Sequence, residues 1–321
     1  MSAKSRHGFV LRFLTMVIKT GIIYHVKEFL KKYWKLILAA VILMIAAAVV
    51  FVLNYTNKPV TYSWDEKEKE NKLSRDITTA INVYTDGTVQ EVFHETGELD
   101  GIQYDILRII PSEHTFLQVD YTEEPKPLSE LVDEDTVASG YAYAGGINGG
   151  FFRLTGKEYG RPVGAVRRKN AWTEWQGEEN TPAYGSGFAT AYFTGDTMWL
   201  KYHGWQKGVW TGDEDWTYEY GYMINAENGI SGSYTYIVDG EAKDITGDDY
   251  GIIDYRTFGR AATIFAQNAQ HEYLLIEIFG VVDDKKILKF LQSKDVVNAL
   301  RMDGGISTQM VYIRRYVSEI K

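Results

Sequence analysis

The segment Tyr141–Phe152 reads YAYAGGINGGFF. Its first seven residues are apolar, aromatic or glycine, and this pattern predicts a buried strand over Tyr141–Ile147 that runs into Asn148-Gly149-Gly150. Glycines at the end of a strand let the backbone approach a ligand closely, because no side chain projects from them. Asn148 adds a hydrogen-bond donor and an acceptor at the same point. The alternative is a glycine-rich turn without a ligand, anchored by the two aromatic residues that follow.

A second segment of the same kind, Arg301–Met310, reads RMDGGISTQM. The run Val296–Met302 predicts a strand that delivers Asp303 into a glycine pair. Ser307 and Thr308 follow with hydroxyl groups, and the backbone N–H groups of such a turn can form an anion-binding nest. The alternative is an ordinary Asp-Gly turn. Two strand ends of this kind in one chain favour a shared role.

Further strand patterns surround both segments and alternate with turn signals. Phe188–Phe193 and Met198–Tyr202 flank Thr194-Gly195-Asp196-Thr197, which indicates a hairpin. Short helices are expected over Leu128–Val137 and over Lys285–Gln292, the latter capped by Asp283 or Asp284. The other expected strands are Tyr104–Ile110, Thr115–Tyr121, Tyr234–Val238, Ala262–Ala266 and Tyr273–Phe279. Many strands and few helices predict a mixed α+β, strand-rich globular domain.

An uncharged apolar run, Leu36–Leu53, precedes this domain and reads LILAAVILMIAAAVVFVL. Its 18 residues contain no Pro or Gly, and as a helix they would measure about 27 Å, close to the thickness of the hydrocarbon core of a bilayer. A helix in a soluble core seldom lacks a polar face over such a length. No small-residue cleavage site follows it, as a signal peptide would require. The run therefore predicts a single transmembrane helix that acts as a signal-anchor.

The distribution of charge predicts the orientation and the domain limits. Eight of the 34 Lys and Arg precede the span, together with one acid, so the positive-inside rule keeps the N-terminus in the cytoplasm. We expect a cytoplasmic basic segment over 1–35, the transmembrane helix over 36–53, a stalk over 54–76 and an extracytoplasmic domain over 77–321. This arrangement predicts a single-pass protein of the cell membrane.

The part beyond the span is acidic and contains no cysteine. It holds the remaining 26 Lys and Arg against 42 Asp and Glu, a formal charge of −16, which argues against nucleic acid as a partner. Without cysteine there is no disulfide and no thiolate metal site, which suits a bacterium that does not rely on oxidative folding outside the cell. We expect no cofactor, although an Asp-rich site could hold a divalent cation.

The two glycine segments together resemble the phosphodiester glycosidase family, through INGGFF at Ile147–Phe152 and MDGGISTQM at Met302–Met310. Shorter stretches match the family in the same order, and these are Arg161–Val166, Val238–Gly240 and Gly259–Ala262. The resemblance covers roughly residues 100–315.

The chain departs from the family pattern at two positions. Ile306 stands where the last turn of the family has a third glycine, and a Cβ there could narrow the site. Ala261 follows Arg260, where the family arginine is usually followed by Thr. An alternative placement of that arginine is Arg256, which Thr257 follows. We favour Arg260, because an apolar strand pattern starts directly after it.

The resemblance implies a hydrolase that cleaves between the sugar and the phosphate of a sugar-1-phosphodiester, and the span Leu36–Leu53 would anchor it in the membrane. The transition state of this cleavage has oxocarbenium character on the sugar, and a carboxylate can stabilise it or attack it. Asp303 is the expected carboxylate. The phosphate needs positive charge more than a strong acid, and the guanidinium fork of Arg260 suits its oxygens. Asn148 completes the expected catalytic set. The expected substrate-binding residues are Gly149, Gly150, Gly304, Gly305, Ser307 and Thr308.

The expected substrate is a phosphate-linked glycan, either a polysaccharide of the bacterial cell envelope or a secreted one. Glu174, Asp239 and Asp254 are further carboxylates that could enter the site. The alternative function is a non-catalytic glycan-binding or scaffold protein of an envelope polysaccharide assembly. The side chain of Ile306 in the last turn favours that alternative.

Overall fold

The chain forms two compact units in the computed structural model, Met1–Asn57 and Lys58–Lys321. The helix Lys31–Val52 belongs to the first unit and overlaps the predicted span Leu36–Leu53. Among the residues that the structure describes, it is the one helix long and apolar enough to cross a membrane. The described residues are 31–36, 38–52, 59–63, 76–153, 157, 159–174, 188–203, 205–206, 209–210, 226–243, 261–280 and 282–320.

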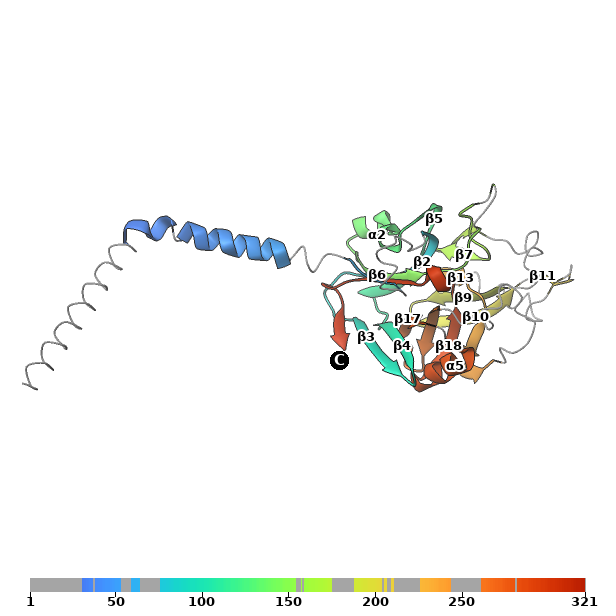
Figure 1. Ribbon diagram of the computed structural model, residues 1–321. Coiled ribbons are helices and arrows are strands. Elements are labelled where there is room, and N and C mark those ends of the chain that lie inside the picture. Colours follow the sequence, from blue (N-terminus) through green and yellow to red (C-terminus); the bar gives the residue numbers. More distant parts are fainter. Residues whose placement is uncertain are drawn as a thin grey trace, which may run out of the picture. The chain divides into compact units, whose positions relative to one another are not determined.

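The second unit is built mainly from three β-sheets (Figure 1). The first is five-stranded, with the order β1-β19-β6-β2-β5. Each neighbouring pair in it is antiparallel. Its strands are β1 (Pro59–Ser63), β19 (Gln309–Ile313), β6 (Ala142–Asn148), β2 (Ile77–Thr85) and β5 (Thr115–Lys126).

The largest sheet is eight-stranded, with the order β15-β14-β18-β16-β17-β4-β3-β20. Its last pair, β20 with β3, is parallel, and the other pairs are antiparallel. Its strands are β15 (Glu241–Ala242), β14 (Thr235–Val238), β18 (Val296–Arg301), β16 (Ala262–Asn268), β17 (Tyr273–Phe279), β4 (Ile102–Ile109), β3 (Val92–Leu99) and β20 (Ser318–Ile320).

The third sheet is again five-stranded, with the order β10-β9-β13-β7-β8. A separate two-stranded sheet joins β11 to β12. The strands of these two sheets are β10 (Thr197–His203), β9 (Phe188–Thr194), β13 (Asn228–Ser231), β7 (Val166–Arg168), β8 (Ala171–Glu174), β11 (Trp205–Gln206) and β12 (Val209–Trp210).

Apolar side chains cover both faces of the eight-stranded sheet. One face packs against the two five-stranded sheets, with contributors such as Phe265 and Leu275. The other face lies under helix α5 (Asp284–Ser293), whose Ile287 and Phe290 are buried against it. Burial on both faces explains why β16 and β17 read as nearly continuous apolar runs instead of alternating ones.

The strand-rich mixed α+β class is confirmed. The predicted hairpin forms between β9 and β10, and β16 pairs with β17 as expected. Of the two predicted caps of helix α5, Asp283 is the cap, and its side chain accepts a hydrogen bond of 2.7 Å from the backbone N–H of Lys285. This bond satisfies one of the free N–H groups of the first helical turn.

The predicted helix over Leu128–Val137 is wrong in extent. The segment forms a 3₁₀ turn, η2 (Leu128–Glu130), and a separate short helix, α2 (Glu134–Ala138). Between them, the carbonyl oxygen of Leu131 accepts a hydrogen bond from the Asn82 side chain at 2.6 Å. The side chain of Asp133 is buried among polar groups. These tertiary contacts interrupt the helix that the local sequence favours.

Strand β1 differs from the prediction, because Pro59–Ser63 lies within the segment predicted as a stalk over 54–76. It pairs with β19, with Val60 opposite Tyr312 and Ser63 opposite Gln309. The run PVTYS is too short to predict a strand from its own pattern. It becomes a strand because it pairs with β19, which is distant in the sequence. Residues 64–75 of that segment lie outside the described part of the chain.

Candidate active site

The sheet topology brings Asn148 and Asp303 together. Asn148 is the last residue of β6, and Asp303 follows β18 by two positions. The turn after Asp303 contains the 3₁₀ element η6 (Gly305–Ser307) and leads directly into β19, the neighbour of β6. The side-chain amide of Asn148 therefore donates a hydrogen bond of 2.8 Å to the carbonyl oxygen of Asp303.

Every hydrogen-bonding position of the Asn148 amide is occupied. Its Oδ1 accepts from the Thr263 hydroxyl at 2.7 Å and from the Gln309 backbone N–H at 3.0 Å. Its Nδ2 also makes a long contact of 3.4 Å with the carbonyl oxygen of Gly149. The residue is 1% exposed. Asn148 therefore acts as a clamp that holds β6, β16 and the turn before β19 in one arrangement.

Asp303 is bonded to the Asn148 clamp through its backbone carbonyl oxygen and is more exposed than Asn148. It is 9% exposed, against 1% for Asn148. Its Oδ1 accepts from the backbone N–H of Gly304 at 2.8 Å. Its own backbone N–H donates to the carbonyl oxygen of Gly149 at 3.2 Å. These bonds fix the carboxylate at the end of a rigid strand, as a reacting or binding group requires.

The glycines of both segments allow the chain to pack against itself. A Cβ at Gly149 would lie 2.5 Å from the Thr79 hydroxyl, and one at Gly304 would lie 2.7 Å from the carbonyl oxygen of Ala261. A Cβ at Gly150 would collide with the carbonyl oxygen of Ser231. Side chains at these three positions would therefore push the elements of the site apart. Their predicted substrate contacts stay a prediction.

Several backbone N–H groups that an anion-binding nest in this turn would use are bonded within the chain. Gly305 donates to Ala261 at 2.8 Å, and its φ of +65° is one that glycine adopts easily. Ser307 and Thr308 donate to carbonyl oxygens of the same turn, at 3.3 and 3.2 Å. The N–H groups of Ser307 and Thr308 thus close the 3₁₀ turn, and the N–H of Gly305 bonds the turn to Ala261.

Ser307 and Thr308 are 1% and 2% exposed. The Thr308 hydroxyl has no hydrogen-bond partner, which is costly for a buried polar group.

Arg260 and Arg256 lie outside the described residues. The residue that follows Arg260, however, is Ala261, whose carbonyl oxygen receives the N–H of Gly305. Of the further carboxylates, Asp239 lies in the exposed β14–β15 turn at a φ of +51°, away from the clamp.

A buried cation that the sequence did not single out as functional lies next to the turn. The guanidinium of Arg301, 2% exposed, has its Nη2 3.6 Å from where a Cβ of Gly304 would be. Its Nη1 donates to the Tyr236 hydroxyl at 2.7 Å and to Asp284 Oδ1 at 3.1 Å. The hydroxyls of Tyr234 and Tyr236 also donate to Asp284. This network ties the Asp303 turn to the start of α5.

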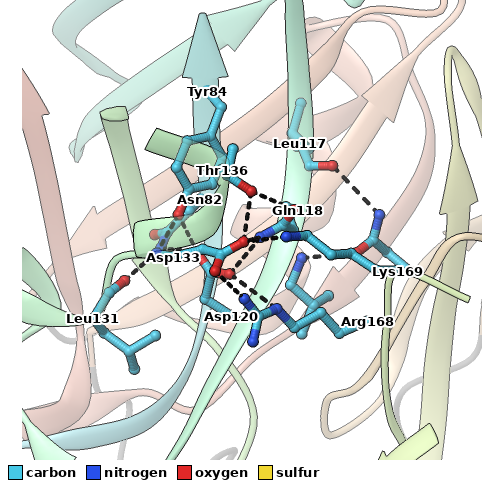
Figure 2. Close-up of polar contacts among 12 residues, drawn as sticks. Asn82, Tyr84, Leu117, Gln118, Asp120, Leu131, Asp133, Thr136, Arg168 and Lys169 are labelled. Carbon is cyan, nitrogen blue, oxygen red and sulfur yellow. Dashed lines mark hydrogen bonds and ion pairs between the residues drawn. The ribbon is translucent and has the colours of Figure 1, made fainter. Parts of the chain in front are cut away.

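A second polar cluster joins β2, β5, the start of α2 and the β7–β8 hairpin (Figure 2). Asp133 receives ion pairs from Arg168 and Lys169, a hydrogen bond of 2.5 Å from the Thr136 hydroxyl and one of 3.0 Å from Gln118. Asp120 nearby accepts from Asn82, Tyr84 and Gln118 at 2.5–2.7 Å. The cations are already neutralised, so the cluster fixes α2 and the β7–β8 hairpin to β5.

The Asp133 contacts predict a dependence of stability on pH. Burial works against its charge, but hydrogen bonds from Lys169, Thr136 and Arg168 outweigh burial and hold its pKa below the ordinary range. A lowered pKa stabilises the fold above the pKa of the unfolded chain, about 4, and this stabilisation is lost as the pH falls. We expect Asp133→Asn to destabilise the protein at pH 7 and to cost progressively less below about pH 4, by at most about 1.4 kcal/mol per pH unit.

Urea unfolding of both proteins across this pH range measures the effect, and Asp135→Asn on the exposed side of α2 is the matched control. A destabilisation by Asp133→Asn that does not change with pH would contradict the ion-pair account.

Among the described residues, no group of three or more His, Asp or Glu side chains is placed to hold a metal ion.

Comparisons with known proteins find weak likenesses to solved structures, among them one zebrafish and one Synechocystis protein. No family model matches the sequence, and no curated protein matches it. The catalytic domain of zebrafish N-acetylglucosamine-1-phosphodiester alpha-N-acetylglucosaminidase, auto-inhibited by its pro-peptide, is similar at 14% identity with a TM-score of 0.40. That alignment covers 79% of this chain and 87% of the zebrafish one. A hypothetical protein from Synechocystis is similar at 14% identity with a TM-score of 0.41, over 68% of this chain and 56% of that one. Likenesses this weak carry no argument about this chain's activity.

Proposed function

We propose that this chain is a membrane-anchored glycoside hydrolase that cleaves the sugar–phosphate bond of sugar-1-phosphodiesters in cell-envelope or secreted glycans. The observation that supports it best is the convergence of Asn148 and Asp303, which are 155 positions apart in the sequence. The residue after Arg260 is hydrogen-bonded into the same turn. Three described residues of the segments that resemble the phosphodiester glycosidase family, Asn148, Ala261 and Asp303, are therefore linked through the same turn, which supports the proposal.

The chemistry assigns a role to each group. The carboxylate of Asp303 stabilises or attacks the oxocarbenium-like carbon of the sugar. Arg260 supplies the cation for the departing phosphate, since a bidentate guanidinium matches phosphate oxygens. Asn148 is a positioning residue in this proposal, because its amide has no hydrogen-bonding position left for a substrate.

The helix Lys31–Val52 completes the proposal. Its length and apolar composition suit a transmembrane anchor. The basic residues before it would keep the N-terminus in the cytoplasm of a bacterial cell. The domain would then act on phosphate-linked glycans outside the cytoplasm.

One observation favours the alternative, a non-catalytic glycan-binding or scaffold protein. Four backbone N–H groups of the turn are bonded within the chain, those of Gly304, Gly305, Ser307 and Thr308. The chain's own atoms also fill the Cβ positions of Gly149, Gly150 and Gly304. A turn closed in this way could present a fixed surface to a glycan without turnover. The two functions differ in whether Asp303 and Arg260 are needed after the glycan is bound.

The test is to incubate the full chain, in a mild detergent, with a panel of sugar-1-phosphodiesters and to quantify free sugar and phosphomonoester. We expect release of both, with the rate lowered about a hundredfold or more by Asp303→Asn, since a positioned carboxylate contributes a factor of this order. Arg260→Ala should weaken both binding and turnover.

The matched control is Asp239→Asn, in an exposed turn whose positive φ Asn tolerates. It should leave the rate unchanged. Turnover that survives Asp303→Asn would contradict the proposal. Glycan binding without turnover, insensitive to Arg260→Ala, would favour the scaffold alternative.

A further inference from the structure

A row of polar and ionisable side chains crosses the inner face of the eight-stranded sheet, where its neighbours are apolar. Glu277 on β17 is directly opposite Thr263 on β16 and Asp105 on β4. Cross-strand partners of this kind have Cβ atoms about 5 Å apart and project from the same face. Phe265 and Leu275, the next inward positions of β16 and β17, belong to the main apolar core. The row is therefore enclosed by the core.

Glu277 is fully buried, and neither of its carboxyl oxygens has a hydrogen-bond partner. The titratable groups facing it are Asp105 on β4 and, beyond Asp105, His94 on β3, Tyr312 on β19 and Glu319 on β20. His94, the one cation-forming side chain of this set, is already engaged, with Nε2 3.1 Å from Asp105 Oδ1 and Nδ1 2.7 Å from Glu319 Oε2. Tyr312 donates to Glu319 at 2.6 Å. No cation in this set neutralises Glu277.

An ionised carboxylate without a donor in such a place is strongly disfavoured. Burial, followed by the nearby Asp105, raises the pKa of Glu277 well above its ordinary value. In its neutral form the O–H of Glu277 is a donor, whereas its carboxylate would be a strong acceptor.

The protonation state of Glu277 bears on the clamp through Thr263. The Thr263 hydroxyl has one proton, which it donates to Asn148 Oδ1 at 2.7 Å. A carboxylate is a stronger acceptor than an amide oxygen, so an ionised Glu277 would compete for that proton. A neutral Glu277 leaves it with Asn148.

We propose that Glu277, held neutral in the core, is a positioning residue that acts through Thr263 to keep the Asn148 clamp closed on the Asp303 turn. Ionisation at alkaline pH would draw the Thr263 hydroxyl away and loosen the turn. Its effect on catalysis rests on the proposed hydrolase function, whereas its protonation state and its coupling to Asn148 do not.

Infrared spectroscopy of the full chain in detergent tests the protonation state. The wild type should show the carbonyl stretch of a neutral carboxylic acid at pH 7, and Glu277→Gln should remove the Glu277 component of that band. Glu272→Gln, on the same hairpin but paired with Arg108, is the matched control and should keep the band. If Glu277→Gln leaves the spectrum unchanged, Glu277 is ionised and the proposal is overturned.

The stability of the same proteins gives a second measurement. The folded chain keeps a proton that the unfolded chain releases above about pH 4, so the folding equilibrium constant of the wild type should fall with rising pH relative to Glu277→Gln. The limit is about tenfold per pH unit. If Glu277→Gln does not fold, the pH titration of the carbonyl band in the wild type decides alone. A band that is already absent at pH 7 overturns the proposal.

The coupling to the site has its own readout. The side-chain amide NMR signals of Asn148 should shift as the pH is raised in the wild type, and should not shift in Glu277→Gln or in Thr263→Val. If the protein hydrolyses sugar-1-phosphodiesters, the alkaline loss of kcat should disappear in Glu277→Gln. Asn148 signals that ignore pH while the carboxyl titrates would overturn the positioning role. Absence of turnover with intact spectroscopic coupling would count against the hydrolase function alone.

Discussion

Replacing Arg301 by methionine should lower the free energy of unfolding by about 3–5 kcal/mol, the cost of removing one partner from a buried ion pair. The guanidinium is 2% exposed and lies 3.1 Å from Asp284, which is itself buried. Methionine fills a similar volume but leaves the Asp284 carboxylate with the hydroxyls of Tyr234 and Tyr236 alone. The measurement is urea unfolding of the full chain in detergent.

The control is Arg108→Met, because Arg108 pairs with Glu272 at 2.6 Å while remaining 29% exposed. A pair that water reaches contributes about 0–1 kcal/mol. Adding Asp284→Asn to Arg301→Met should recover part of the loss, since it removes the stranded charge. The account fails if Arg301→Met costs no more than Arg108→Met, or if the second substitution only adds to the loss.

Replacing Asn148 by alanine should destabilise the domain by about 3 kcal/mol or more, since each buried polar group left without its partner costs about 1–3 kcal/mol. Three groups would lose their partner, namely the Thr263 hydroxyl, the Gln309 N–H and the carbonyl oxygen of Asp303. The turn that carries Asp303 would lose its tie to β6. We therefore expect the loss of stability together with a loss of turnover, both measured on the same preparation.

Asn298→Ala is the matched control, since Asn298 is 4% exposed and makes two hydrogen bonds, at 3.0 and 3.4 Å, away from the clamp. It should cost less and should leave the Asp303 turn intact. If Asn148→Ala is no more destabilising than Asn298→Ala, the amide is not the clamp described above.

Elements with a strong local pattern could be predicted from the sequence. The Asp-capped helix α5, the β9–β10 hairpin and the pair of β16 with β17 each carry their signal in adjacent residues. The resemblance of two distant segments indicates Asn148 and Asp303 as candidates. Their contact depends on the sheet order, because β19, which follows the Asp303 turn, pairs with β6.

The features that the sequence did not reveal depend on distant partners. Strand β1 exists through its pairing with a strand far away in the sequence, β19, in a register that runs from Pro59 opposite Ile313 to Ser63 opposite Gln309. The helix expected over Leu128–Val137 yields to contacts of Leu131 and Asp133 with other strands. The burial of Asn148, and the use of the turn's N–H groups by the chain itself, arise from packing between sheets, which periodicity along one strand does not report.

The central claim is that the bond between sugar and phosphate is broken on the sugar side, and hydrolysis in water labelled with heavy oxygen tests it most directly. Water that attacks the sugar carbon leaves its oxygen on the sugar, whereas water that attacks phosphorus leaves it on the phosphate. Mass spectrometry of the phosphomonoester should therefore find no heavy oxygen in the product of the full chain. A phosphomonoester that carries one heavy oxygen would show cleavage at phosphorus and would contradict the role given to Asp303.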